Sequence, residues 1–264
     1  MILSEPKHPN QFSKIKAIVF DLDGTVYEGE NLVEGVLDAI NRFSFEGFKI
    51  YFCTNISTRT RQEIAHRLKC SGIETTSDFI FSSAYAAAYY LANTGIKKVS
   101  LLGTSGLKNE LCAAGLTVVD ELDKGQALVV GLDPMISYSS MSLIAALLGK
   151  NIPIIACNRD RWFPANNGDL KPGCGIMVDL VEALLGRSVD LVVGKPNTLL
   201  LEMLSQRSGF NNDELLIIGD SVESDVALAE AFGSPWVLYA PRGCDNIPDN
   251  SITSMTDLPR MILR

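Results

Sequence analysis

Four short apolar segments, rich in β-branched residues, recur along the chain at residues 16–20, 48–53, 189–193 and 214–218. Runs of this length that stop at turn residues are typical of buried β-strands. Polar residues follow each segment directly, as Asp21-Leu-Asp-Gly24, Thr54-Asn55, Gly194-Lys195 and Gly219-Asp220. The pattern therefore predicts four strands that each deliver a polar or charged group at the carboxyl end.

Between these strands, apolar residues recur at helical spacing. The clearest case is residues 31–43, where Val33, Val36, Leu37 and Ile40 fall on one face. We also expect helices at residues 60–68, 83–91, 198–204 and 224–231. Strands that alternate with helices predict a parallel sheet with right-handed crossovers, an α/β, Rossmann-like fold. Because ligands bind beyond the strand carboxyl ends of such sheets, the four polar groups are expected to converge in one place.

Residues 92–188 carry none of these strand-end groups and have an α/β rhythm of their own. Strands are expected at residues 98–102, 127–130 and 153–156, and helices at 139–148 and 175–185. We therefore predict a second domain, inserted at a surface connection, that could act as a lid. The core is then made of residues 1–91 and 189–264, with the inserted α/β domain at 92–188. A short helix is expected near the end of the chain, at residues 258–264.

Composition narrows the class of protein. The chain has 264 residues, of which 47% are hydrophobic and 20% charged, as in ordinary globular proteins. Its net charge is −8 and no Lys/Arg-rich run occurs, which argues against a nucleic-acid partner. No apolar run is long enough to span a bilayer, and the first residues lack the apolar core of a signal peptide. Six scattered cysteines without a CxxC pair argue against a zinc ribbon or a disulfide framework, so a cytoplasmic location is expected.

Four aspartates, Asp21, Asp23, Asp220 and Asp225, follow the first and last of the four predicted strands. Alone, Asp21 and Asp23 fit an Asp-Gly turn, and Asp225 fits an acid in the first turn of a helix. Together, carboxylates at converging strand ends would repel one another strongly. A hard cation such as Mg²⁺ relieves that repulsion and prefers oxygen ligands, so a magnesium site is predicted here.

Lys195, Thr54 and Asn55 complete the set of strand-end groups. Lys195 is either a surface lysine in a turn or a partner for the carboxylates and a substrate phosphate. Thr54 and Asn55 fit a helix N-cap and could equally offer a hydroxyl and an amide to phosphate oxygens. Acids, a hard metal, a lysine and a hydroxyl suit phosphoryl transfer, which depends on positioning and charge neutralisation.

The segments Asp21-Leu-Asp-Gly-Thr25, Thr54-Asn55, Lys195-Pro196 and Gly219-Asp220 with Asp225 resemble, in order, the four motifs of the haloacid dehalogenase (HAD) superfamily. The insertion is similar to the α/β cap of the NagD and p-nitrophenylphosphatase-like branch. Two patterns within it carry that likeness, Val130-Gly-Leu-Asp133 followed by Tyr138, and Asn158-Arg-Asp160.

The resemblance implies a role for each motif residue. Asp21 would be the nucleophile that forms a phosphoaspartate, and Asp23 would protonate the leaving group and then activate water. Mg²⁺ would be held by Asp21, Asp220 and the main-chain carbonyl of Asp23, with Asp225 in support. The transferring phosphoryl group would be bound by Thr54, Asn55 and Lys195.

The loop at residues 158–164 in the cap has two interpretations. It could select the substrate, with Asn158 at its start, Arg159 and Arg161 for anionic groups and Trp162 for stacking. Alternatively, it is an ordinary loop whose aromatic residues anchor it to the cap.

The resemblance implies a Mg²⁺-dependent phosphatase that hydrolyses small phosphorylated metabolites through an aspartyl-phosphate. Two alternatives remain open, a phosphotransferase or mutase with the same nucleophile, and a catalytically silent metabolite-binding protein. A homodimer formed through the exposed cap surface is also left open.

Overall fold

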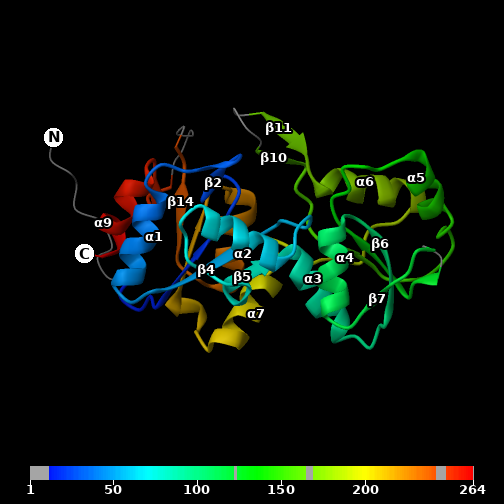
Figure 1. Cartoon of the computed structure of the whole chain (residues 1–264), viewed down its shortest axis with the longest axis horizontal. Coiled ribbons are helices and arrows are strands. Elements are labelled where there is room, and N and C mark those ends of the chain that lie inside the picture. The colour runs from blue at the N-terminus through cyan, green and yellow to red at the C-terminus, as the bar shows by residue number, and fades with distance from the viewer. Residues whose placement is uncertain (1–11, 122–123, 165–168, 242–247, 264) are drawn as a thin grey trace.

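The computed structural model describes residues 12–121, 124–164, 169–241 and 248–263. Two parallel sheets lie beside each other along the long axis of the molecule, as Figure 1 shows. The larger sheet has six strands in the order β15-β14-β13-β1-β4-β5, all parallel. Its strands are β1 (Ala17–Phe20), β4 (Lys49–Thr54), β5 (Ile80–Ser82), β13 (Leu215–Gly219), β14 (Trp236–Tyr239) and β15 (Ser251–Ile252). The predicted Rossmann-like α/β fold is confirmed.

Helices cover both faces of this sheet because alternate strand residues point to opposite sides. On β1, Ile18 and Phe20 belong to a buried cluster with helices α1, α2 and α9. Ala17 and Val19 belong to a second cluster with α3, α7 and α8. These helices are α1 (Val36–Phe45), α2 (Arg61–Cys70), α3 (Ser83–Ala92), α7 (Leu199–Ser208), α8 (Ala227–Phe232) and α9 (Leu258–Ile262).

The smaller sheet has five parallel strands in the order β12-β9-β8-β6-β7. They are β6 (Lys98–Leu102), β7 (Thr117–Val118), β8 (Ala127–Val130), β9 (Ile154–Ala156) and β12 (Leu191–Val192). Helices α4 (Ser105–Ala113), α5 (Tyr138–Ala145) and α6 (Cys174–Leu185) accompany it. An antiparallel hairpin, β10 (Trp162–Pro164) with β11 (Leu170–Pro172), stands above the junction of the two sheets in Figure 1.

The strand expected at residues 189–193 was assigned to the wrong sheet. β12 pairs with β9 of the smaller sheet, and backbone bonds from Asp190 to Ile154 and from Val193 to Ala156 fix that position. Both neighbours of β1 in the larger sheet are already taken by β4 and β13. The division at residue 188 stays a prediction, and we propose that the inserted domain extends to Val193 instead.

Two further elements differ locally from the prediction. The helix expected from residue 31 begins at Val36, because Asn31–Leu32 forms strand β3, which pairs with β2 (Tyr27–Glu28). Gly35, at φ 81°, makes the left-handed turn between that hairpin and α1. Near the last motif, a π-helical turn at Val222–Val226 precedes α8, where an α-helix from residue 224 was expected.

The described cysteines are all free, and Cys244 lies outside the described residues. No helix in the described part of the chain has the length and apolar character needed to cross a membrane.

Candidate active site

The first motif forms a tight turn directly after β1. The backbone N–H of Asp21 still donates to Ile218 of β13, and the turn then closes with three bonds, from Thr25, Val26 and Tyr27, to the carbonyl of Leu22. Gly24 is required in this turn for two reasons. Its φ is +99°, and a Cβ there would lie 2.2 Å from Oδ2 of Asp220. The turn thus presses the backbone of the first motif against the carboxylate of the last.

The last motif is held by a comparable close approach. A Cβ on Gly219 would lie 2.2 Å from Cγ of Asp225, so only glycine lets that side chain pass. Ser221 caps the π-helical turn by accepting from the backbone N–H of Ser224, and Asp225 accepts from the backbone N–H of Ser221 at 3.2 Å. The turn therefore aims Asp225 back toward the strand end rather than toward solvent.

Lys195 is the centre of the site. It is 4% exposed, and its Nζ donates to Oδ1 of Asp21 at 2.5 Å and to Oδ1 of Asp225 at 2.6 Å. Burial alone would lower the pKa of this ammonium, but the two carboxylates outweigh burial and hold it well above its usual value. Lys195 is therefore a permanent buried cation, and its interpretation as a surface lysine is wrong.

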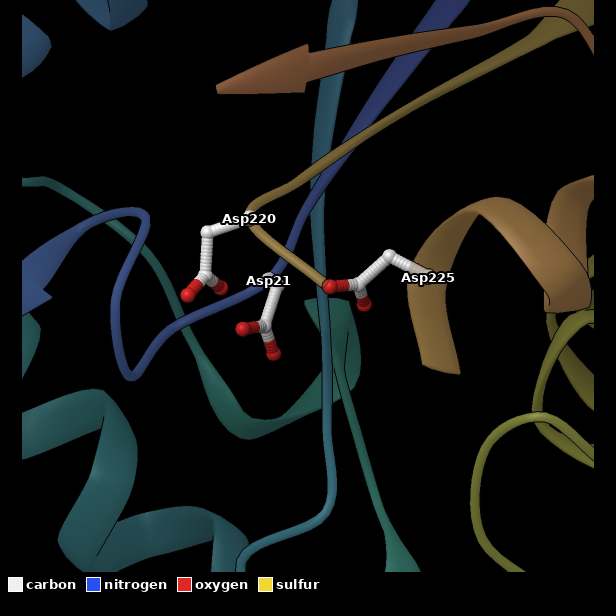
Figure 2. Close-up of side chains that lie close together, drawn as sticks. All are labelled: Asp21, Asp220 and Asp225. Carbon is white, nitrogen blue, oxygen red and sulfur yellow. The ribbon is translucent and has the colours of Figure 1, made fainter. Parts of the chain in front are cut away.

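One oxygen from each of Asp21, Asp220 and Asp225 lies within 4.8 Å of the others. Figure 2 shows these three side chains close together, with Asp21 between Asp220 and Asp225. Desolvation, with the charge of Asp225 adding to it, raises the pKa of Asp220 to about 6. Because the negative charges of these carboxylates repel one another, a hard divalent cation bound between them would relieve the repulsion. The three oxygen donors therefore fit the predicted metal. Asp23 was predicted to contribute only its main-chain carbonyl, and its side chain is not part of this group.

Asp23 faces helix α2 instead. Arg67 Nη1 lies 3.9 Å from Oδ1 of Asp23, and Nη2 donates to the carbonyl of Gly29 at 2.6 Å. The same guanidinium lies 3.8 Å from the ring centre of Tyr27. Burial raises the pKa of Asp23, and the charge of Arg67 opposes that rise. Arg67 was missed in the sequence because it lies in the last turn of α2, where a basic residue is common in any helix.

The side chains of the second motif have hydrogen-bond partners within the protein. Thr54 is buried and accepts from the backbone N–H of Ile56 at 3.2 Å. The amide oxygen of Asn55 accepts from the backbone N–H of Lys195 at 2.8 Å, and its nitrogen donates to Oδ2 of Asp160 at 2.9 Å. The side-chain amide expected to face a phosphate is thus engaged in tying Lys195 to the cap loop.

The cap loop reaches the same cavity, but its residues serve different ends. Asn158 is 3% exposed, donates to the carbonyl of Asn55 at 2.7 Å and accepts from the backbone N–H of Asp160. These bonds join the cap loop to the second motif, and Asn158 also lines the cavity. Arg159 and Arg161 are both paired with acids, and Trp162 is 55% exposed on β10.

A cavity of about 610 Å³ joins these parts. Its lining includes both motif aspartates after β1, the acids after β13, Lys195 and the cap loop through Phe163. Asp160 also lines it and was not among the predicted site residues, although it closes the Asn158-Arg-Asp pattern. The cavity brings the predicted core and cap residues together, whereas their roles stay proposals.

The chain matches two family models, haloacid dehalogenase-like hydrolase over residues 18–117 and HAD-hydrolase-like over residues 192–242. It is 33% identical to the sugar-phosphatase AraL of Bacillus subtilis over 251 residues, 92% of each chain. It is 30% identical to phosphoglycolate phosphatase 2 of Arabidopsis thaliana, covering 90% of this chain and 86% of the relative.

Solved structures give the same picture. A p-nitrophenyl phosphatase from Archaeoglobus fulgidus is 30% identical with a TM-score of 0.85, covering 94% of this chain and 99% of that one. A glycerol phosphate phosphatase from Mycobacterium tuberculosis, solved in complex with magnesium, is 27% identical with a TM-score of 0.82 over 93% and 77% of the two chains.

Proposed function

The chain belongs to the haloacid dehalogenase-like hydrolases, in their NagD and p-nitrophenylphosphatase-like branch, and we propose that it hydrolyses small phosphate monoesters with Asp21 as the nucleophile. It is a phosphoric monoester hydrolase by family. The observation that carries the proposal is the buried ammonium of Lys195, bonded to Asp21 and Asp225 at the floor of a cavity.

The reaction proceeds in two displacements. A carboxylate oxygen of Asp21 attacks phosphorus, the ester oxygen leaves, and Asp23 gives that oxygen its proton. Asp23 then takes a proton from water, which attacks the phosphoaspartate and releases inorganic phosphate and free Asp21. Lys195 neutralises charge on the phosphoryl oxygens and on Asp21 throughout, which is the main demand of phosphoryl transfer.

A divalent cation, proposed to be Mg²⁺, completes the site. Asp21, Asp220 and the main-chain carbonyl of Asp23 would hold it, with Asp225 supporting through Lys195. When bound, the cation neutralises charge on the phosphoryl group and orients it for attack. The three clustered carboxylates and the raised pKa of Asp220 support this assignment.

Other residues bind and select the substrate. Thr54 and Lys195 are proposed to hold the phosphoryl oxygens, and Asn55 to fix Lys195 in place. On the cap side, Arg159, Arg161 and Trp162 border the leaving group, with Asn158 holding their loop. The substrates are proposed to be small phosphorylated metabolites, since the cavity is closed on one side by the cap loop.

Two alternatives are weighed against hydrolysis. A silent binding protein would not need a buried lysine between two carboxylates, and the phosphatase relatives favour an enzyme. A phosphotransferase would use the same Asp21 and differ only in whether a sugar hydroxyl or water accepts the phosphoryl group. Free phosphate measured with and without a sugar acceptor separates transfer from hydrolysis.

The test is phosphate release from p-nitrophenyl phosphate, with and without Mg²⁺, by the wild type and by Asp21→Asn. We expect metal-dependent release that the substitution abolishes, together with an acid-stable, hydroxylamine-sensitive phosphoenzyme in the wild type alone. Asp38→Asn, an exposed aspartate on α1, is the matched control and should leave release unchanged. Full activity in Asp21→Asn would overturn the mechanism.

A further inference from the structure

Both arginines on the cap side of the cavity are paired with carboxylates of the same helix, α6. Arg159 donates to both oxygens of Glu182, at 2.5 and 3.3 Å. Arg161 donates to Oδ2 of Asp179 at 2.8 Å. From the sequence alone these arginines suggested recognition of an anionic group on the substrate, and their pairing argues against that use.

A paired guanidinium offers a substrate carboxylate no net attraction. To reach Arg159, such a group would have to displace Glu182, which exchanges one bidentate carboxylate contact for another. Even where the pair opens transiently, the carboxylate of Glu182 stays nearby and offsets the field of the arginine. The same reasoning holds for Arg161 and Asp179.

Acidic side chains outnumber basic ones in the cavity lining. Among the described residues, six carboxylates and three cationic side chains line it. Lys195, the third cation, is buried and engaged with Asp21 and Asp225. Two of the lining acids, Asp160 and Glu223, have no role in the proposed reaction. A second negative charge on the substrate would therefore meet lining cations that are already paired with carboxylates.

Part of the cavity lining is apolar. Leu132, Trp162 and Phe163 line the cavity from the cap, and Ile56 lines it from the second motif. These side chains can cover the carbon frame of an alcohol, a sugar or an aryl group, while the neighbouring polar groups meet its hydroxyls.

We propose that this site selects phosphate monoesters with an uncharged leaving group and discriminates against a leaving group that carries a carboxylate. The inference rests on the proposed function and narrows it. Among the activities named for its relatives, this selectivity is closer to that of the sugar-phosphatase and the glycerol phosphate phosphatase than to that of the phosphoglycolate phosphatases.

The test compares two small phosphate monoesters that differ at one end group, the neutral hydroxymethyl group of 2-hydroxyethyl phosphate and the carboxylate of 2-phosphoglycolate. We expect kcat/KM to favour the neutral ester by about tenfold, the effect of one uncompensated charge in a half-exposed site. The inhibition constants of both esters against p-nitrophenyl phosphate give the same comparison without turnover. Equal values, or a preference for phosphoglycolate, would overturn the proposal.

Glu182→Gln tests the cause. It releases Arg159 from its charge partner and keeps an oxygen to accept from the backbone N–H of Val189, as Glu182 does at 2.9 Å. We expect kcat/KM for phosphoglycolate to rise about threefold to fivefold, with little change for hydroxyethyl phosphate. Asp179→Asn should act likewise through Arg161.

Glu46→Gln is the control, because it removes the partner of Arg42 in a remote ion pair on α1. It should change neither substrate. A parallel change for both esters in Glu182→Gln would contradict the proposal. If p-nitrophenyl phosphate is hydrolysed but the neutral ester is not preferred, only the proposed substrate selectivity is refuted. If no ester is hydrolysed, the proposed phosphatase function is refuted.

Discussion

Replacing Lys195 with methionine removes the cation that is paired with two buried acids while nearly preserving the side chain's volume. The ammonium is 4% exposed and donates to Asp21 and Asp225 at 2.5 and 2.6 Å. In Lys195→Met these two carboxylates remain close together and buried with no ammonium between them. The variant must then either unfold more readily or bind a proton between the acids.

The size of the effect follows from that choice. Breaking a buried ion pair by removing one partner costs about 3–5 kcal/mol of the free energy of unfolding. For a chain of this size, that loss lowers Tm by roughly 5–10 °C. The pKa of Lys195 is raised in the folded protein, so its contribution is fully present below the ordinary lysine pKa and covers the whole neutral range. Because protonated carboxyls no longer repel, the deficit of the variant should shrink as pH falls toward 4.

The assay is thermal unfolding followed by circular dichroism at several pH values, in buffer with a chelator, alongside kcat for p-nitrophenyl phosphate with Mg²⁺. We expect kcat to fall by about 10²–10³-fold, as when one electrostatic donor to a transition state is removed. Lys69→Met, which breaks an exposed contact with Glu74, is the matched control and should change neither quantity. A Tm loss below about 2 °C, or a deficit that grows as pH falls, would refute the reasoning.

Three further outcomes are expected. Gly24→Ala should abolish the Mg²⁺-induced rise in Tm, because its Cβ would meet the Asp220 carboxylate at 2.2 Å. The control is Gly47→Ala, which is equally left-handed at φ +92° but has open space around it, so it should lower stability and keep the Mg²⁺ response; equal Mg²⁺ responses of the two variants would count against the predicted contact. Since the folded-state pKa of Asp220 is raised to about 6, the metal-free wild type should lose stability relative to Asp220→Asn as pH rises from 4 through 6. Added Mg²⁺ should stabilise the wild type more at pH 7 than at pH 5, and a metal-free wild type that gains stability between pH 4 and 6 would contradict the direction of this pKa shift. Arg67→Met frees the carboxylate of Asp23 and should therefore lower kcat for alkyl phosphates several-fold more than for p-nitrophenyl phosphate, whose good leaving group needs little proton donation. Arg67→Lys should restore part of this difference, and equal losses of kcat for both kinds of substrate would show that Arg67 has only a structural role.

The strand ends were predictable because their signal is local. A buried strand needs a short β-branched run, and its end needs polar or turn residues, so β1, β4 and β13 were placed to within about a residue. The convergence of Asp21, Thr54 and Asp220 then followed from parallel packing, since the carboxyl ends of neighbouring parallel strands meet at one edge. No residue-by-residue knowledge of contacts was needed for this step.

Strand partners, by contrast, were not predictable from the same signal. β12 looks like a strand of the larger sheet in sequence, because an apolar run ending at Gly194-Lys195 carries no mark of the sheet it joins. Its pairing with β9 depends on which sheet edge is free. Lys195 reaches the cluster in spite of this, because Asn55 holds its backbone from the second motif.

The sequence by itself determined the α/β architecture, the strand ends and the set of acids with their lysine, since each depends on residue type within a few positions along the chain. Only the tertiary structure decided how the polar side chains are used: Asn55 and Asn158 tie the core to the cap loop, Arg67 faces Asp23, and both cap arginines are neutralised by α6. The physical reason is that a hydrogen bond or ion pair formed across many residues of chain depends on the position and direction of both partners, which the three-dimensional packing sets and a local pattern does not encode.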